Sequence, residues 1–184
     1  MTTENKSAQQ NNPNQNQRRR GFRNRRRNRE SDEISLIENV IKIRRVSKTV
    51  KGGRNLSFNA MVAVGDGAGK VGIALASASA VPDAVQRAVQ YAKNKMVEIN
   101  LNNTTLPHEG VYKFGSSKVM LKPAAPGTGL IAGGGVRAVL EAVGVKDVVS
   151  KTFVSTNAIN VVYATVEALK AMKDPKKEIS RRKN

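Results

Sequence analysis

Basic residues gather in one short stretch of the sequence, at a spacing that suits phosphate binding. Six of the thirteen residues from position 42 to position 54 are positive: Lys42, Arg44, Arg45, Lys48, Lys51 and Arg54. Only Glu38 opposes them nearby. Because like charges repel unless a counter-charge is close, this stretch predicts contact with a polyanion rather than a merely solvated strand face. The charge does not separate RNA from DNA, but the scarcity of aromatic residues argues against base stacking and favours folded RNA recognised by shape and phosphate.

Two glycine-rich segments also have phosphate-binding spacings. Gly67 to Gly72 fits the dinucleotide fingerprint letter for letter, but a strand is expected after it, where that motif requires a helix. Gly127 to Gly135 does run into an expected helix, with Arg137 one turn inside, so its backbone N–H groups could hold a phosphate. Tight packing of the loop would require the same glycines. Nucleic-acid phosphate, a small phosphotransferase site and simple packing therefore stay open for this segment.

Other catalytic and metal chemistry has little support. The chain has no cysteine and one histidine, His108, which excludes thiolate metal sites, a cysteine nucleophile and a multi-histidine centre. The acidic residues between positions 34 and 172 are isolated and offer no close carboxylate pair for acid–base work. We expect no enzyme activity, no cofactor and no metal.

The composition gives the charged stretch a context. The chain has 184 residues and a net charge of +18. Half of this charge lies in residues 1–33, with nine basic and four acidic side chains, and in residues 173–184, with six and two. Both terminal segments lack an apolar period, so we expect disorder there. The arginine-rich stretch from Arg18 to Arg27 suggests an RNA-contacting arm, with a solubilising tail or a mitochondrial presequence as alternatives.

No apolar run approaches the roughly 18–20 residues that span a bilayer, and the polar N-terminus lacks the apolar core of a secretory signal. These observations predict a soluble intracellular protein without a membrane partner.

The elements that must position these residues form two groups. Residues 34–50, 56–64 and 70–76 alternate as strands, and the residues from Val81 to about position 101 follow a helical period that begins at Pro82. On this alternation Val40, Lys42, Arg44, Val46, Lys48 and Val50 share one face.

Residues 102–172 predict a second group. A hairpin from Val111 to Leu121 bends at Gly115 and is followed by a helix capped by Gly144. A strand from Val145 to Val154 and a last helix after Asn157 complete it. We expect an α+β fold of two small domains: β-β-β-α over residues 34–101 and a β-β-α-β-α sandwich of sheet and helices over residues 102–172.

Many short motifs, in order, resemble the bacterial small-subunit ribosomal protein five family. The series comprises residues 45–54, Phe58, residues 64–67, 81–84, 107–109, 122–124, 126–129, 131–134, 136–141 and 159–162. Together they extend over about residues 36–172, which makes coincidence improbable.

The resemblance implies a first domain similar to double-stranded-RNA-binding folds and a structural place in the cytoplasmic ribosome. The implied partners are small-subunit rRNA, small-subunit ribosomal proteins four and eight, and mRNA where it enters its channel, with a role in decoding fidelity. It also implies that Lys48 to Arg54 form a loop that reaches into rRNA. A general RNA- or DNA-binding chaperone is the alternative. The expected RNA-binding residues are Lys42, Arg44, Arg45, Lys48, Lys51, Gly52, Gly53, Arg54, Lys118, Lys122 and Arg137.

The chain departs from the family pattern at a few positions. Ala76 to Ala80 stand where the family usually has Gly and Lys, and Tyr163 stands where Arg is usual. Val154, Thr156 and Ala158 interrupt the usual Gly, Asn and Pro around the start of the last helix. We assign no RNA contact to these positions.

Overall fold

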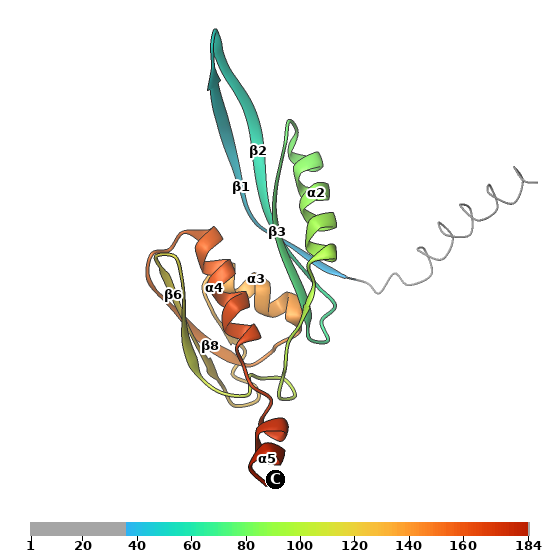
Figure 1. The fold of residues 1–184 in the computed structure, drawn as a ribbon, viewed down its shortest axis with the longest axis vertical. Coiled ribbons are helices and arrows are strands. Elements are labelled where there is room, and N and C mark those ends of the chain that lie inside the picture. The colour runs from blue at the N-terminus through green and yellow to red at the C-terminus, as the bar shows by residue number, and fades with distance from the viewer. Residues whose placement is uncertain (1–35, 184) are drawn as a thin grey trace, which may run out of the picture. The chain divides into compact units, whose positions relative to one another are not determined.

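The computed structural model describes residues 36–183, which form two four-stranded sheets with helices packed against them (Figure 1). The expected disordered extension 1–33 lies outside the described residues. In chain order the elements are β1 (Ile37–Val50), β2 (Gly53–Gly65), β3 (Lys70–Ala78), α2 (Val81–Asn94), β4 (Val97–Glu98), β5 (Gly110–Phe114), β6 (Ser117–Pro123), β7 (Leu130–Ile131), α3 (Gly134–Val143), β8 (Val148–Val154), α4 (Ala158–Lys170) and α5 (Pro175–Lys183). The mixed α+β architecture is the one that the sequence predicts.

The first sheet has the order β1-β2-β3-β4, with antiparallel neighbours and α2 packed on one face. Pro82 stands in the first turn of α2, as expected. The interface is built from small side chains, since Ala74 and Ala76 on the sheet meet Ala88 and Ala92 on the helix. Small residues let the helix backbone approach the sheet closely.

A β-bulge in β1 changes which residues share a face. Asn39 pairs with Ala63 and Val40 with Val62, but the next pair is Lys42 with Met61, so Ile41 is the extra residue. Because side chains alternate along a strand, the bulge reverses the alternation after it. The prediction that Val40 shares a face with Lys42 and Arg44 is therefore wrong: Val40 lies on the α2 side, and the two basic residues lie on the other side.

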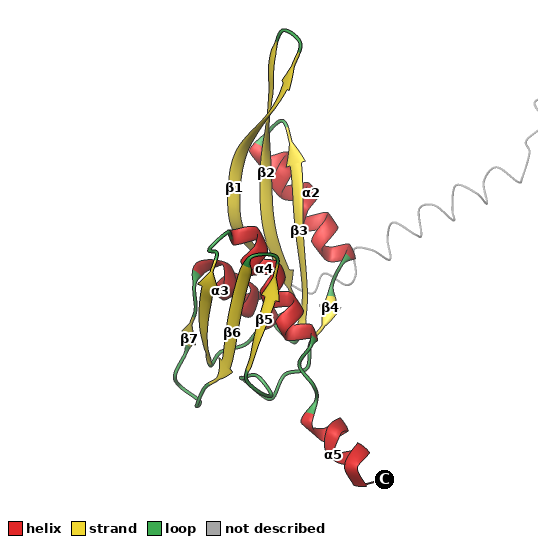
Figure 2. Ribbon diagram, turned by 60° about the vertical axis from the view of Figure 1, so that its left-hand side comes forward, coloured by secondary structure: helices red, strands yellow, loops and turns green. Residues whose placement is uncertain are grey.

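The second sheet has the order β5-β6-β8-β7. β7 runs parallel to β8, and α3 connects the two as a crossover. This two-residue strand was not predicted, because it is too short to show an alternating pattern. The strand expected over residues 145–154 begins only at Val148. Helix α4 packs on β5 and β6, and the two helices cover one face of the sheet (Figure 2).

The two sheets share a hydrophobic core. Met61 and Val71 of the first sheet belong to the same buried cluster as Val136 and Leu140 of α3 and Val162 of α4. The turn between β2 and β3 also hydrogen-bonds to the end of α3, since the N–H groups of Gly67 and Gly69 donate to carbonyl oxygens of Ala142 and Val143, at 3.1 and 3.0 Å. The domain boundaries expected near residue 101 stay a prediction.

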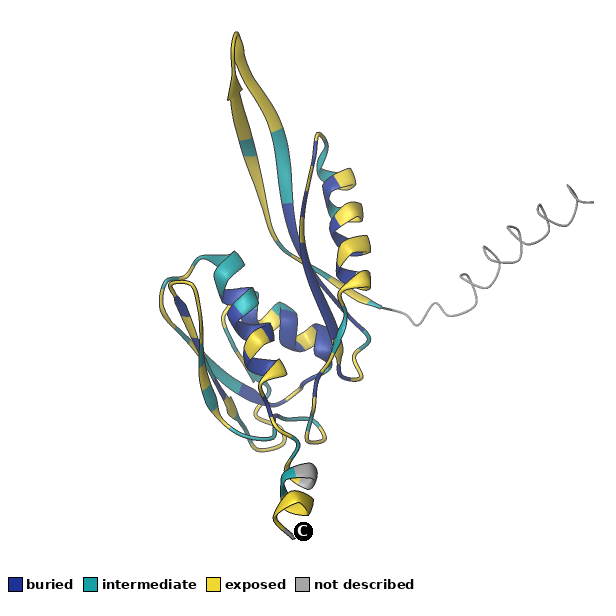
Figure 3. Cartoon of the chain, in the orientation of Figure 1, coloured by how far each residue is buried: buried dark blue, intermediate teal, exposed yellow. Residues whose placement is uncertain are grey.

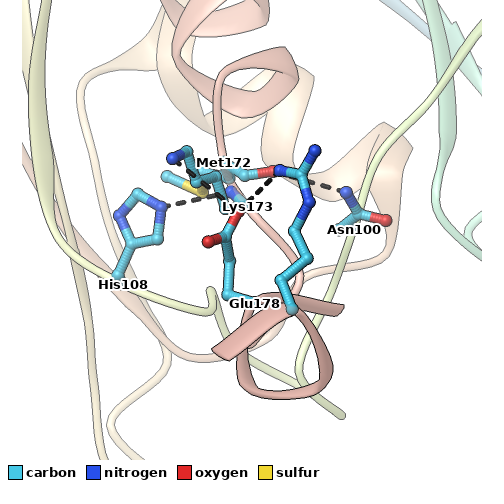
Figure 4. Close-up of polar contacts among 6 residues, drawn as sticks. Asn100, His108, Met172, Lys173 and Glu178 are labelled. Carbon is cyan, nitrogen blue, oxygen red and sulfur yellow. Dashed lines mark hydrogen bonds and ion pairs between the residues drawn. The ribbon is translucent and has the colours of Figure 1, made fainter. Parts of the chain in front are cut away.

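The C-terminal segment is a helix where we expected disorder. Residues 175–183 form α5, with Pro175 as the first residue and Glu178 in the first turn. The chain leading into it is held by contacts distant in the sequence: Asn100 Nδ2 donates to the carbonyl oxygen of Met172 (3.3 Å), and the N–H of Lys173 donates to His108 Nε2 (3.2 Å) (Figure 4). Contacts between residues so distant in the sequence produce no local pattern of apolar residues, so they cannot be recognised from the sequence. Among residues 36–183 no helix is long and apolar enough to span a bilayer.

Candidate nucleic-acid interface

The first two strands extend past the rest of their sheet as a two-stranded arm. The last residue of β3, Ala78, pairs with Phe58, so beyond this point β1 and β2 pair only with each other. Residues 47–56, which we call the arm, are all exposed (Figures 1 and 3). Between Val50 and Gly53 the turn has two residues, and Gly52 takes a left-handed φ of 90°, which suits glycine. The arm buries no side chain, so it contributes little to the core. Its paired strands hold charged side chains away from the rest of the protein.

The basic residues of the arm and its base lie on both faces of the ribbon. Lys42, Arg44 and Lys48 pair with Met61, Asn59 and Asn55 and lie on the side of α3 and α4. Arg45 and Arg54 lie on the opposite side, and Lys51 is in the turn. A ribbon that is positive on both faces suits insertion between phosphates better than lying flat on one surface.

Carboxylates do not neutralise this charge. Glu38, the acid nearest in sequence, pairs with Lys93 of α2 (3.1 Å). Arg44 donates to the side-chain oxygen of Asn157 at the start of α4 (3.2 Å). Within residues 36–183 no ion pair is formed by any of the six basic residues between positions 42 and 54. Arg44 is thus positioned by a neutral partner, and no carboxylate among the described residues offsets its charge.

The loop before α3 is already occupied by a carboxylate. Asp147 is buried, and one of its oxygens accepts hydrogen bonds from the N–H groups of Gly127 and Gly129, both at 3.0 Å. Its other oxygen accepts from Thr104 (3.1 Å). The hydrogen bond from Gly129 is the main cause that lowers the pKa of Asp147, together with those from Thr104 and Gly127 and the charge of Lys146, against an opposing effect of burial. A phosphate could not use these N–H groups without displacing an anion, so packing explains this part of the segment.

The other glycine motif is a turn, as the sequence predicts. Gly67 and Gly69 lie between β2 and β3, and β3 follows directly. Their N–H groups bond to α3, and the Asp66 carboxylate accepts from the N–H groups of Ala68 and Lys70 (2.8 and 2.9 Å). A dinucleotide site requires a helix directly after the turn. A strand follows it here, so the geometry of a dinucleotide site is not formed.

The remaining predicted RNA-binding residues lie elsewhere. Lys118 and Lys122 are on the face of β6 that points away from the helices, and Lys122 forms an ion pair with Glu109 (3.6 Å). Arg137 is exposed on α3 and donates to the carbonyl oxygen of Leu130 (2.8 Å). The sequence reading missed Lys113, which is directly opposite Lys118, and Lys151, on the same face. Alternation within residues 110–114 and 148–154 would have identified both.

His108 has a structural role. Its Nε2 accepts a hydrogen bond from the N–H of Lys173 (3.2 Å), and its Nδ1 lies 3.0 Å from the carbonyl oxygen of Glu109. Among the described residues no group of three or more His, Asp or Glu side chains could hold a metal ion.

Tyr163 packs against the second sheet. Its ring stacks on Phe114 of β5, with centroids 5.1 Å apart and an angle of 22° between the planes. The two rings therefore fasten α4 to the edge strand of the second sheet.

Comparison with known proteins gives one family. The N-terminal domain of ribosomal protein S5 matches residues 36–100, and the C-terminal domain of ribosomal protein S5 matches residues 112–183. A protein named small ribosomal subunit protein uS5 from Chloroflexus aurantiacus is 52% identical over 149 residues, which cover 81% of this chain and 84% of the relative. Proteins of the same name from Dehalococcoides mccartyi (strain CBDB1; 49%, 83% and 88% covered) and Syntrophobacter fumaroxidans (48%, 79% and 87% covered) are similarly related.

Proposed function

Because the chain belongs to the ribosomal protein S5 family, we propose that it is a structural constituent of the small ribosomal subunit, located in the cytoplasm, that binds folded rRNA through phosphate contacts. The family is structural, and the chain is not an enzyme. The observation that carries the rRNA contact is the arm, exposed along residues 47–56 and flanked by unneutralised cations on both faces.

The arm inserts between rRNA segments. A two-stranded ribbon is narrow, and its turn residue Lys51 and the nearby Arg54 reach phosphates that a flat sheet face could not approach together. Gly52 and Gly53 keep the tip narrow because they add no side chains. Lys42, Arg44 and Arg45 neutralise phosphates at the base of the arm. We assign residues 34–101, which include the arm, as the RNA-binding domain.

The finer assignments extend the same proposal. Small-subunit ribosomal proteins four and eight are the neighbours, and the protein supports decoding fidelity and the channel through which mRNA enters. The family resemblance supports these partners. Lys118, Lys122 and Arg137, which lie outside the arm and its base, make secondary contacts with rRNA.

The test compares two charge reversals at exposed sites. Arg54→Glu alters the arm, and Lys95→Glu makes the same change of charge at the end of α2, away from it. We expect Arg54→Glu to weaken binding to a folded rRNA fragment and to reduce the salt slope of log K by about one contact, whereas Lys95→Glu changes both much less. The two proteins are also assayed for co-sedimentation with small subunits after a high-salt wash.

Equal losses for the two variants, or normal sedimentation of Arg54→Glu with small subunits, would contradict the assignment of the arm. A further measurement separates the ribosomal role from that of a general chaperone. The wild-type chain should prefer the folded rRNA fragment to an unrelated duplex of equal length, and equal affinity for both would favour the chaperone.

A further inference from the structure

Side chains of β1 fasten the base of the arm to the helices of the second sheet. Asn39 Nδ2 donates to a carbonyl oxygen of α3 (3.1 Å), and Ile41, the residue that the bulge adds, packs against the buried cluster of α3 and α4. Arg44 donates to Asn157 at the start of α4, 3.2 Å away (Figures 1 and 2). Toward the arm, Arg44 is the last residue of β1 that hydrogen-bonds to α3 or to the start of α4, among the residues that the structure describes.

Asn157 uses its side chain for Arg44 and not for its own helix. It is the N-cap residue of α4, a position where asparagine is preferred because its side-chain oxygen can accept from the first N–H groups of the helix. Here the side chain makes no such capping bond, and its oxygen accepts from Arg44, 113 residues away in the sequence. The side chain therefore fixes the position of a basic residue instead of stabilising the end of α4.

The partner preserves what Arg44 can offer to an anion. An amide oxygen is neutral, so it leaves the guanidinium a charge that a carboxylate partner would offset. A guanidinium has five N–H donors, so one hydrogen bond to Asn157 leaves others to bond to a phosphate. A side chain that is already held in place also loses less rotamer freedom when RNA binds.

The hydrogen bond is not needed to join β1 to the helices. It is exposed to solvent, and Asn39 and Ile41 already fix the same strand a few residues earlier. A role in binding therefore accounts for it better than a role in folding.

We propose that Asn157 is a positioning residue for RNA binding, which holds the charged guanidinium of Arg44 at the base of the arm in the place where it meets an rRNA phosphate. Asn157 acts through Arg44 and does not itself bind the RNA. The proposal rests on the proposed function, because it explains the geometry of one cation of that interface.

The test measures the affinity of Asn157→Ala for the folded rRNA fragment at several salt concentrations. Because Arg44 must then be ordered on binding, we expect the affinity to fall by about twofold to tenfold. The salt slope of log K should keep its wild-type value, since no charge is removed. Asn160→Ala is the matched control, with the same change three residues further along α4, at a side chain that forms no hydrogen bond with a basic residue among the described residues. It should bind like the wild type.

Asn157→Asp separates the position of Arg44 from its charge. A carboxylate would still hold the guanidinium but would offset its charge, so we expect the salt slope to fall by about one contact. Asn160→Asp adds the same negative charge away from Arg44 and should change the slope less. Equal slopes for Asn157→Asp and the wild type would contradict the role of the neutral partner.

A double-mutant cycle distinguishes positioning from a structural role. In an Arg44→Ala background, Asn157→Ala should lower the affinity no further, because its effect depends on Arg44. An equal loss in both backgrounds, or wild-type affinity of Asn157→Ala alone, would overturn the proposal. If Asn157→Ala does not fold, Asn157→Ser repeats the measurement, since its hydroxyl can still cap α4 but is one bond shorter than the amide oxygen. A wild-type chain that shows no preference for the folded fragment would instead overturn the proposed function, and this proposal with it.

Discussion

Val154 holds a backbone conformation that valine rarely adopts. Its φ is 68°, in the left-handed region, and the side chain is 82% exposed at the end of β8. A β-branched residue is strained in this region by roughly 1–2 kcal/mol, and exposure means that no buried contact repays it. Glycine adopts this φ without strain.

We therefore expect Val154→Gly to raise the free energy of unfolding, by up to about 1 kcal/mol after the extra chain entropy of glycine is subtracted. Val111→Gly is the matched control, because it makes the same chemical change at an exposed strand position without a positive φ. The control should lose stability. Urea unfolding of the two variants decides the matter, and a loss in both would show that Val154 is not strained.

We expect Asp147 to make the stability of one loop depend on pH. Its pKa is lowered, chiefly by the hydrogen bond from Gly129, so the folded state prefers the ionised form. A group with a lowered folded pKa stabilises the protein above its unfolded pKa, near 3.8, and this stabilisation disappears as the pH falls through the lower folded value.

Asp147→Asn should lower the melting temperature at neutral pH and reduce the loss of stability below about pH 4. Thr104→Val removes one of the hydrogen-bond donors to the carboxylate and should give an intermediate effect. Thermal melts from pH 7 to pH 3 measure both. An Asn variant whose melting temperature follows the wild-type acid profile would mean that Asp147 does not anchor the loop.

At the scale of elements, the rRNA contact that we propose for the arm is separable from the stability of the fold. Val46 and Ser57 pair with each other, so residues 47–56 can be replaced by an Asn-Gly turn without breaking any other strand pair. Because every residue removed is exposed, we expect the free energy of unfolding to change by less than about 0.5 kcal/mol while rRNA affinity falls sharply. A large loss of stability in urea would contradict this separation.

At the scale of the whole molecule, the contact between the first sheet and α3 joins the two halves. Gly144 caps α3 with a φ of 93°, and a Cβ there would overlap the carbonyl of Gly67 in the β2–β3 turn. The hydrophobic cluster shared by both sheets lies directly beside this contact. The two halves are therefore expected to unfold together.

Gly144→Ala should lower the free energy of unfolding by roughly 2 kcal/mol or more, in a single transition, because the left-handed φ and the overlap both oppose it. Gly134→Ala, at the exposed first residue of α3 where a Cβ meets nothing, should be neutral or stabilising. Circular dichroism and tyrosine fluorescence during urea unfolding should coincide. Two separate transitions would contradict the shared core.

Local physics let the sequence determine much of this protein. Alternation and helical period located the long strands and helices, Pro82 and Gly144 were recognised at helix ends, and the charge between positions 42 and 54 identified the candidate RNA-binding ribbon. Family motifs made the ribosomal assignment. All these signals depend on residues within a few positions of one another.

Only the tertiary structure decided the rest, because it depends on residues distant in the sequence. The bulge at Ile41 puts Lys42, Arg44 and Lys48 on the side of α3 and α4, on the opposite face from Val40, and its position is set by pairing with β2. Asp147 fills the loop that had the spacing of a phosphate site, from 18 residues beyond Gly129. The face of the second sheet that points away from α3 and α4 exists only once β5, β6, β8 and β7 are side by side, since each strand contributes one or a few of its side chains.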